Sequence, residues 1–444
     1  MTDGADEVGQ SPPHRSLALP GSSRRLTWDP DAYLDSLEPI GWRLGLERMH
    51  KLTTALGMPQ HRFASIHVVG TNGKSSVARM TAALLEAHGI GSGACLSPHT
   101  ARWAERTLIH GEEVDAAAWS SAVERVATAA EGVNRTLEEG DAVTQFEAAT
   151  AATFVALASA PVKAAAIEAG LGGRLDATNT IPSRVTVLTS IGLDHTEWLG
   201  ETELEIAAEK LAVLRDQTTL VLGRVSPEVE ALAERTAAAR GARLLRAPED
   251  PGPELQLLAP GGFQRRNFAL ARTAAAAFLG ELDPERVAEV AATVAVPGRL
   301  ERIAGRPPTF VDAAHNPDGA AALAEALPAV VGGRRVVACL AILADKDAAA
   351  MVRALAPALE RAVCTELPAD GPKSRVGGNF SARRPSVRAG ELAEMCEAAG
   401  LPAEAEPSFA VALARATALA SEPPEGAVLV AGSHYAIAPA RATL

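Results

Sequence analysis

The stretch SIHVVGTNGKSS, residues 65–76, decides the fold of this chain. Residues 65–69 form a short apolar, largely β-branched run, which predicts a buried strand. A glycine-rich turn follows at 70–73, and from Lys74 onward the apolar residues recur at helical spacing. This layout is typical of a site for a phosphate chain. Glycines let backbone N–H groups approach the phosphate oxygens, while the helix N-terminus and the lysine attract negative charge.

The spacing of this loop departs from the commonest phosphate loop, because Val68 stands where that pattern has its first glycine. The alternative is a tight strand-to-helix turn with an incidental lysine. We favour phosphate binding because glycine, lysine and serine fall together at the mouth of the predicted helix. The predicted nucleotide-binding residues of the loop are Gly70, Thr71, Asn72, Gly73, Lys74, Ser75 and Ser76.

Length and composition narrow the class of protein. The 444 residues suffice for two or three domains, and a formal net charge of -12 argues against a nucleic-acid partner. The alanine-rich stretches are too short and too interrupted to span a bilayer, and the N-terminus lacks a basic-then-apolar leader. Four widely spaced cysteines suit a reducing compartment. We therefore expect a soluble, cytoplasmic monomer without a membrane partner.

The rest of the chain predicts an α/β fold in two domains. Residues 1–25 mix Gly, Ser, Pro and charges without an apolar period, which predicts a disordered tail. Strand and helix patterns then alternate, which favours a mostly parallel sheet in a nucleotide-binding domain over 26–296. The pattern breaks near Pro297, and a smaller Rossmann-like domain is expected over 297–444. The predicted strands are 65–69, 91–96, 164–168, 185–188, 220–222, 309–311, 336–340, 362–365 and 428–430, with a helix over 203–214.

Polar residues directly follow several predicted strands, at the edge where open α/β sheets bind ligands. A nucleoside triphosphate at Lys74 requires Mg²⁺, which prefers oxygen ligands. The candidates are Ser97, Glu168, Asp194 and His195. A carboxylate at the end of a buried strand is costly without a cation, which favours Glu168 as a ligand. Ser97 would alternatively be a turn residue, and His195 a packed or capping histidine.

Several motifs together resemble the folylpolyglutamate synthase family of the Mur-ligase superfamily, including its bifunctional dihydrofolate synthase form. The matching segments are 70–76, 97–99 with 105–106, 144–147, 168–179, 192–200, 297–301, 312–317 and 343–347. They span the chain from about Tyr33 to Tyr435. The string GLGGRLDATN at 170–179 is specific.

The resemblance implies a role for each matching residue. Magnesium would be held by Ser97, Glu168 and His195. ATP would also be contacted from the domain interface by Asn267, Arg299 and Asp312. The pterin site would be lined by Thr144, Gln145, Phe146, Glu147, Leu175, Asp176 and Ala177. Lys210 would be carried as a carbamate near the metals, and His315 would stand near the reacting carboxylate and the incoming glutamate.

This sequence also departs from the family pattern. Ser75 replaces a glycine after the lysine, so the resemblance does not say which of Ser75 and Ser76 faces the metal. Ala313 replaces a glycine, and His434 stands where a leucine is usual. Asp176 would accept the ring N–H groups of a pterin, or alternatively would only cap the turn after the glycines.

The implied reaction is ATP-dependent amide formation through an acyl phosphate. The catalytic residues would include Lys74, Lys210 and His315, with L-glutamate, ATP and a folate or dihydropteroate as partners. One alternative is a cell-wall ligase acting on a UDP-muramyl substrate. Such enzymes carry a UDP-binding domain ahead of the loop, whereas fewer than seventy residues precede Gly70 here. The other alternative is a non-catalytic phosphate-loop binding module.

Overall fold

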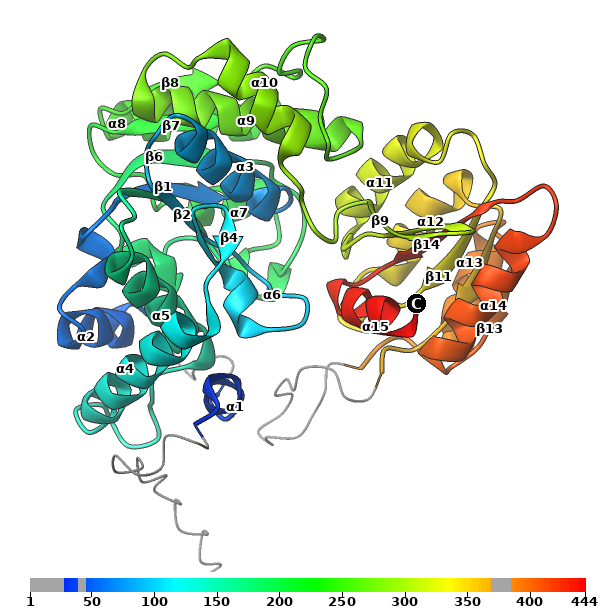
Figure 1. Cartoon of the computed structure of the whole chain (residues 1–444), viewed down its shortest axis with the longest axis horizontal. Coiled ribbons are helices and arrows are strands. Elements are labelled where there is room, and N and C mark those ends of the chain that lie inside the picture. The colour runs from blue at the N-terminus through cyan, green and yellow to red at the C-terminus, as the bar shows by residue number, and fades with distance from the viewer. Residues whose placement is uncertain (1–27, 39–44, 369–384) are drawn as a thin grey trace, which may run out of the picture.

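The computed structural model describes residues 28–38, 45–368 and 385–444 of the chain. Figure 1 shows two α/β units side by side, the first coloured blue to green and the second yellow to red. The tail expected over residues 1–25 lies outside the described residues. Among the described residues, no helix is long and apolar enough to cross a membrane.

The first unit is built on a sheet that contains eight strands within the described residues, in the order β4-β3-β2-β5-β1-β6-β7-β8. Strands β2, β5, β1, β6, β7 and β8 run parallel, and β3 and β4 add an antiparallel edge. The strands are β1 Ala64–Val69, β2 Ser92–Cys95, β3 Thr107–Ile109, β4 Glu112–Glu113, β5 Ala164–Glu168, β6 Ser183–Leu188, β7 Thr219–Leu222 and β8 Arg243–Arg246.

Helices cover both faces of this sheet because its central strands are buried on both sides. The side chains of Ile66 and Val68 pack with α3, α9 and α10, whereas the opposite face packs against α4, α5, α7 and α8. The helices are α1 Pro30–Asp35, α2 Glu47–Ala55, α3 Lys74–Ala87, α4 Ala116–Asn134, α5 Gln145–Ser159, α6 Thr196–Leu199, α7 Glu203–Leu211, α8 Pro227–Ala239, α9 Gly262–Leu279 and α10 Pro284–Thr293.

The second unit has six strands within the described residues, in the order β13-β12-β11-β14-β10-β9. All neighbours are parallel except β9, which pairs antiparallel with β10. The elements are β9 Glu301–Gly305, β10 Pro308–Val311, α11 Pro317–Val330, β11 Val336–Leu340, α12 Ala348–Leu355, β12 Arg361–Cys364, α13 Ala389–Ala398, β13 Ala403–Ala405, α14 Phe409–Ser421, β14 Ala427–Ala431 and α15 Ile437–Thr443. The expected class, a two-domain α/β fold with mostly parallel sheets, is confirmed.

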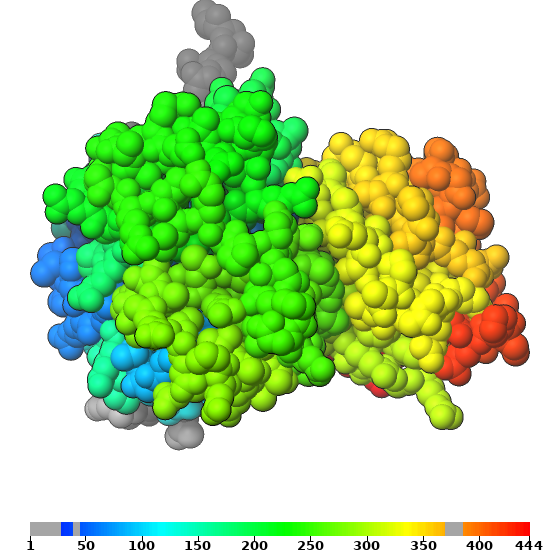
Figure 2. All heavy atoms as spheres, turned by 90° about the horizontal axis from the view of Figure 1, so that it is seen from above, coloured from blue at the N-terminus to red at the C-terminus, as the bar shows by residue number. Residues whose placement is uncertain are grey.

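The chain passes from α10 to β9 through residues 294–300, the segment in which the sequence places the domain boundary. The space-filling view in Figure 2 shows the two units in contact, with the first in blue to green and the second in yellow to red. Helices α9 and α11 meet across this contact, where a side chain at Gly261 would press on Ala326. The carboxyl ends of both sheets' parallel strands supply the residues described next.

Candidate active site

The glycine-rich turn lies between β1 and α3 and is braced from β6. Gly70 has φ +147°, and a Cβ there would lie 1.9 Å from Thr189 Oγ1. Gly73 has φ +84°, and a Cβ there would lie 2.5 Å from Asn267 Oδ1. The Thr189 hydroxyl donates to the Asn72 carbonyl oxygen at 2.6 Å. Glycine is therefore required at both positions by close approach as well as by backbone conformation.

Lys74 is the first residue of α3, and its ammonium donates to the Thr71 carbonyl oxygen at 3.1 Å. Burial lowers the pKa of Lys74, whereas the nearby charges of Glu168 and Asp194 raise it and that of Arg299 lowers it further. Lys74 and Arg299 thus bring two cationic side chains, one from each unit, toward the helix N-terminus. This arrangement suits a polyphosphate, which would offset both charges.

Glu168 ends β5 beside the phosphate loop and is 1% exposed. Its Oε1 lies 2.9 Å from the Ser75 hydroxyl, and its Oε2 accepts from the Ser97 backbone N–H at 2.8 Å. Burial raises the pKa of Glu168, and the charge of Lys74 opposes this. Of the two loop serines, Ser75 therefore contacts the carboxylate, whereas Ser76 lines the inter-unit cavity described below.

These oxygens fit a hard divalent cation. A carboxylate and a hydroxyl lie together at the phosphate loop, and Mg²⁺ takes few protein oxygens when phosphates and waters complete its shell. Among the described residues, no three side chains of the His, Cys, Asp and Glu types gather as a ready-made metal site. The donor set is therefore one that a bound nucleotide would complete.

His195 directly precedes α6 and has a left-handed conformation, with φ +53°. Burial lowers the pKa of its imidazole to about 4; the charge of Asp194 opposes this shift, and the charges of Lys346 and His315 add to it. The ring is therefore neutral at physiological pH, which is the form that binds metals. Its Nε2 lies 3.8 Å from Asp194 Oδ1.

Asp194 joins the two units. Its Oδ1 accepts from the Lys346 ammonium at 2.6 Å, and its Oδ2 accepts from Asn316 Nδ2 at 3.1 Å and lies 3.4 Å from His315 Nε2. Burial would raise the pKa of Asp194, but the hydrogen bond with His315 and the charges of His195 and Lys346 bring it well below its usual range. A carboxylate of the first unit thus binds three residues of the second.

A reciprocal amide pair makes a second link between the units. Asn72 Nδ2 donates to Asn316 Oδ1 at 3.1 Å, and Asn316 Nδ2 donates to Asn72 Oδ1 at 3.0 Å. Asn72 belongs to the phosphate loop, and Asn316 caps α11 by accepting from the Gly319 backbone N–H at 2.8 Å. The phosphate loop is therefore attached directly to the start of a second-unit helix.

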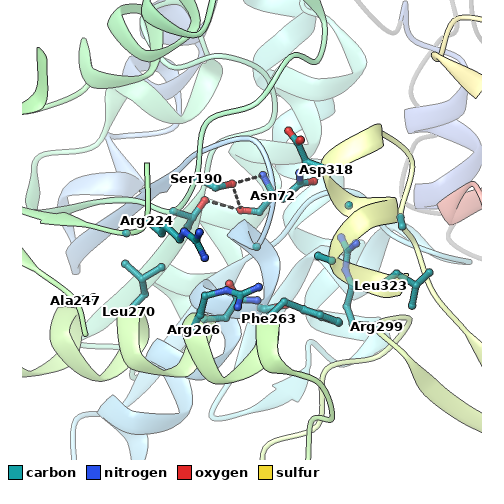
Figure 3. Close-up of a pocket in the computed structure, with 18 of the residues that line it drawn as sticks. Asn72, Ser190, Arg224, Ala247, Phe263, Arg266, Leu270, Arg299, Asp318 and Leu323 are labelled. Atoms are coloured by element: carbon teal, nitrogen blue, oxygen red, sulfur yellow. Dashed lines mark hydrogen bonds between the residues drawn. The ribbon is translucent and has the colours of Figure 1, made fainter. Parts of the chain in front are cut away.

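A cavity of about 230 Å³ opens between the two units next to the phosphate loop. Figure 3 shows Arg224 and Leu270 on the side of the first unit and Arg299, Asp318 and Leu323 on the side of the second. The predicted ATP-contacting residues that line the cavity are Asn72, Gly73, Ser76, Asn267, Arg299 and Asp312. Lining residues that the sequence did not single out include Arg224, Phe263, Arg266, Asp318 and Leu323.

Asp312 fixes the backbone around Arg299. Its carboxylate accepts from the Leu300 N–H at 2.7 Å and from the Ala314 N–H at 2.8 Å. Burial raises its pKa, which the charge of Arg299 opposes. His315 follows, and its Nδ1 lies 2.9 Å from the Ala313 carbonyl oxygen. Its Nε2 faces Asp194, 3.4 Å from Oδ2.

Lys210 lies in the last turn of α7 and is 4% exposed. Burial, followed by the charge of Lys74, lowers the pKa of its ammonium to about 7. A Cβ at Gly173 would lie 2.9 Å from the Lys210 Cα. The loop of residues 170–176, called the glycine loop below, therefore rests directly on the backbone of this helix. A fraction of Lys210 is consequently neutral near pH 7, as carbamate formation requires.

The segment 144–147 divides into supporting residues and one ring. Thr144 caps α5. The Glu147 carboxylate accepts from the Thr144 backbone N–H and forms an ion pair with Arg48 Nε at 3.0 Å. Gln145 Nε2 donates to a carbonyl oxygen of α1 at 3.0 Å. Phe146 instead packs under the glycine loop, where a Cβ at Gly170 would lie 2.4 Å from its Cζ. The capping-box pattern of Thr144 and Glu147 was a visible signal for this supporting role.

Asp176 makes the turn contacts that the sequence allowed as an alternative. Its Oδ2 accepts from the Leu171 N–H at 2.8 Å, and its Oδ1 accepts from the Thr178 N–H at 2.9 Å. It is 5% exposed, and burial raises its pKa. Leu175 is 40% exposed and Ala177 is buried. Contact of these residues with a pterin stays a prediction.

Comparisons with known proteins agree with this geometry. The second unit matches the family described as Mur ligase, glutamate ligase domain, over residues 298–434. A Mycobacterium tuberculosis protein named dihydrofolate synthase/folylpolyglutamate synthase is 36% identical over 358 residues, which cover 72% of this chain and 74% of that relative. The chain belongs to the dihydrofolate synthase/folylpolyglutamate synthase family. The resemblance noted in the sequence is confirmed, and the chain is an ATP-dependent ligase.

Solved structures of this family share the fold over nearly the whole chain. Mycobacterium tuberculosis folylpolyglutamate synthase complexed with ADP has a TM-score of 0.83 and 31% identity, covering 93% of this chain and 96% of that one. Escherichia coli FolC in complex with DHPP and ADP has a TM-score of 0.76 and 27% identity, covering 92% and 95%. A bifunctional family member from Yersinia pestis, complexed with AMPPNP and a Mn ion, has a TM-score of 0.76 and 28% identity, covering 93% and 96%. Use of a divalent metal with the nucleotide is thus supported for the family.

Proposed function

We propose that the chain joins L-glutamate to the carboxyl group of a folate or of dihydropteroate, with ATP as the energy source and Mg²⁺ as the metal. The observation that carries the proposal is that Lys74 feels the charges of Glu168 and of Arg299, and that Arg299 lines the inter-unit cavity next to the phosphate loop. Together they provide charge for a triphosphate, a carboxylate for its metal and a contribution from each unit. A simple phosphate-binding module would need only the first unit.

The reaction proceeds in two steps. An oxygen of the acceptor carboxylate attacks the γ-phosphorus of ATP, the bond to the β-phosphate oxygen breaks, and an acyl phosphate and ADP form. The neutral amine of glutamate then attacks the acyl carbon, phosphate leaves, and the amide remains after loss of one proton. Lys74 and Arg299 offset the charge that gathers on the transferring phosphoryl group.

The metal, when bound, would offset further negative charge on the phosphoryl oxygens. Glu168 and Ser75 would hold it through their oxygens, with His195 as the predicted nitrogen ligand and Ser97 beside them. Lys210 would join this group as a carbamate. A carboxylate as deeply buried as Glu168 gains most from a cation at this position.

Closure of the two units protects the acyl phosphate. The contacts of Asp194 with Lys346 and of Asn72 with Asn316 hold the units together beside the phosphate loop. A closed site excludes water, which would otherwise hydrolyse the intermediate. We place the hinge at the proposed boundary between residues 296 and 297. We propose that the enzyme acts as a monomer.

The acceptor would enter beside Phe146 and the glycine loop. Both acceptors are proposed because an aromatic ring next to backbone N–H groups suits the flat pterin that they share. The test is ADP release from the whole chain with ATP and Mg²⁺, omitting acceptor or glutamate in turn. We expect turnover only when both are present. Turnover that needs neither, or that needs a UDP-muramyl acceptor, would overturn the proposal.

A further inference from the structure

A buried histidine lies in the strand that ends in the phosphate loop. His67 is fully buried in β1, three residues before Gly70, and pairs in register with Ile167 on β5 and Thr186 on β6. The other core positions of this strand are mostly aliphatic, as parallel strands covered on both faces usually are. An imidazole at such a position calls for a specific partner.

The partner is Thr178, at the end of the GLGGRLDATN segment. His67 Nε2 lies 2.9 Å from Thr178 Oγ1, and the same hydroxyl contacts Asp176 Oδ1. The Asp176 carboxylate already accepts from the Leu171 and Thr178 backbone N–H groups, so it acts as an acceptor. The Thr178 hydroxyl hydrogen therefore points at Asp176, and its oxygen accepts from His67 Nε2–H.

This direction of donation fixes the tautomer of His67. With the proton on Nε2, Nδ1 is a bare acceptor, and within the described part of the chain it is buried without a hydrogen-bond partner. A buried unpaired polar atom is destabilising, and an aliphatic side chain at position 67 would avoid it. The hydrogen bond between His67 Nε2 and Thr178 is thus the polar contact that compensates for burying the imidazole.

The chain of hydrogen bonds from His67 through Thr178 to Asp176 ends on the glycine loop. Asp176 binds the Leu171 N–H and thereby closes the turn between residues 171 and 176. Gly170, just before this turn, rests on the Phe146 ring. The angle of the loop over that ring consequently depends on where Asp176 is held.

Arg215 holds the far side of the same segment. Its Nη2 donates to the Asn179 carbonyl oxygen at 2.6 Å and to the Ile181 carbonyl oxygen at 3.2 Å. The short helical turn Ala177–Thr180 is therefore fixed at its end by Arg215 and at its start by His67. Only the second of these links reaches the strand that leads to the phosphate loop.

We propose that His67 and Thr178 are positioning residues for the acceptor substrate. Through Asp176 they set the position of the glycine loop over Phe146. Strand β1 thereby holds both the glycine loop and the phosphate loop in place. The proposal rests on the proposed function, which assigns this loop to the acceptor. Neither residue is expected to touch a substrate atom.

Thr178→Val and Thr178→Ser form a matched pair for the test. Valine has nearly the same shape but can neither accept from His67 nor donate to Asp176, whereas serine keeps the hydroxyl. We expect Thr178→Val to raise the KM for the acceptor about tenfold, in line with the loss of a buried hydrogen bond, and to leave the KM for ATP within about twofold. Thr178→Ser should stay close to the parent for both substrates.

His67→Leu separates positioning from folding. It removes the donor and also the unpaired Nδ1, so we expect the KM for the acceptor to rise while the unfolding temperature stays level or increases. If Thr178→Val does not fold, this variant decides alone. An unchanged acceptor KM in a folded variant, or equal losses for acceptor and ATP together with a lower unfolding temperature, would overturn the proposal. Acceptor-independent turnover in the parent would instead refute the proposed function.

Discussion

Asp194→Asn is the perturbation whose effect follows most directly from the structure. Asp194 and Lys346 lie 2.6 Å apart, and each side chain is 8% exposed. Removing one partner of a buried ion pair costs about 3–5 kcal/mol, because the other charge is left without compensation. The pair joins the two units, so the cost falls on their closed arrangement rather than on the folding of either unit.

Opening lets Lys346 regain water, so the variant should relieve the cost by populating an open form. At 1.36 kcal/mol per factor of ten, we expect kcat/KM to fall by about 10²- to 10⁴-fold. Small-angle scattering with a non-hydrolysable ATP analogue should show a larger radius of gyration than for the parent. Asp216→Asn is the matched control, since its pair with Arg240 is exposed and worth about 0–1 kcal/mol.

Lys346→Met tests the same contact from the other unit, away from the predicted metal ligands. The double variant Asp194→Asn with Lys346→Met should lose less than the sum of the two single losses, because no unpaired charge remains. Additive losses, or an Asp194→Asn protein with the scattering profile and kcat/KM of the parent, would refute the reasoning that this pair holds the units closed.

The site carries five further predictions. Lys74→Ala should abolish ATP turnover without lowering the unfolding temperature much, since no apolar burial is lost; normal turnover would exclude the phosphate-loop interpretation. Glu168→Gln keeps the shape but loses the charge, so metal-dependent activity should disappear, and an unaltered dependence on Mg²⁺ concentration would contradict metal binding there. The pKa of Lys210 is lowered to about 7 in the folded chain. Between about pH 7 and about pH 10 the unfolded chain therefore binds more protons than the folded chain, so this group makes the free energy of unfolding rise with pH. Bicarbonate should likewise stimulate activity more at about pH 8 than at about pH 6, and a Lys210→Met protein that keeps this stimulation would count against the carbamate. Gly170→Ala should press on the Phe146 ring and raise the acceptor KM more than the ATP KM, a difference that steady-state kinetics would detect.

Local signals in the sequence predicted the elements that carry the site. The run at 65–76 has the strand, turn and helix signals within one continuous stretch, and the structure places β1, the turn and α3 there. Short edge strands were missed, since β8 has arginine at both ends and β13 has only three residues. The helix expected over 203–214 ends at Leu211, one turn early.

Contacts between the units could not be read from the sequence. Asp194 and Lys346 are 152 positions apart, and no local pattern relates them. The contact of Glu168 with Ser75 rather than with Ser76 likewise depends on the direction of the hydroxyls at the start of α3, which the sequence does not give. Glu147 shows the opposite case. The sequence analysis placed it in the pterin site, but the capping-box spacing of Thr144 and Glu147 is visible in the sequence and predicts the supporting role that the structure shows.

Mass spectrometry of the products tests the central claim most directly. The whole chain would be incubated with ATP, Mg²⁺, L-glutamate and an acceptor whose carboxyl oxygens carry a heavy isotope, using dihydropteroate and a reduced folate in separate reactions. The account predicts an acceptor heavier by one glutamyl residue and one heavy oxygen in the released phosphate, because an acyl phosphate passes that oxygen to phosphorus. Consumption of ATP with unlabelled phosphate, or without a glutamyl product from either acceptor, would contradict it.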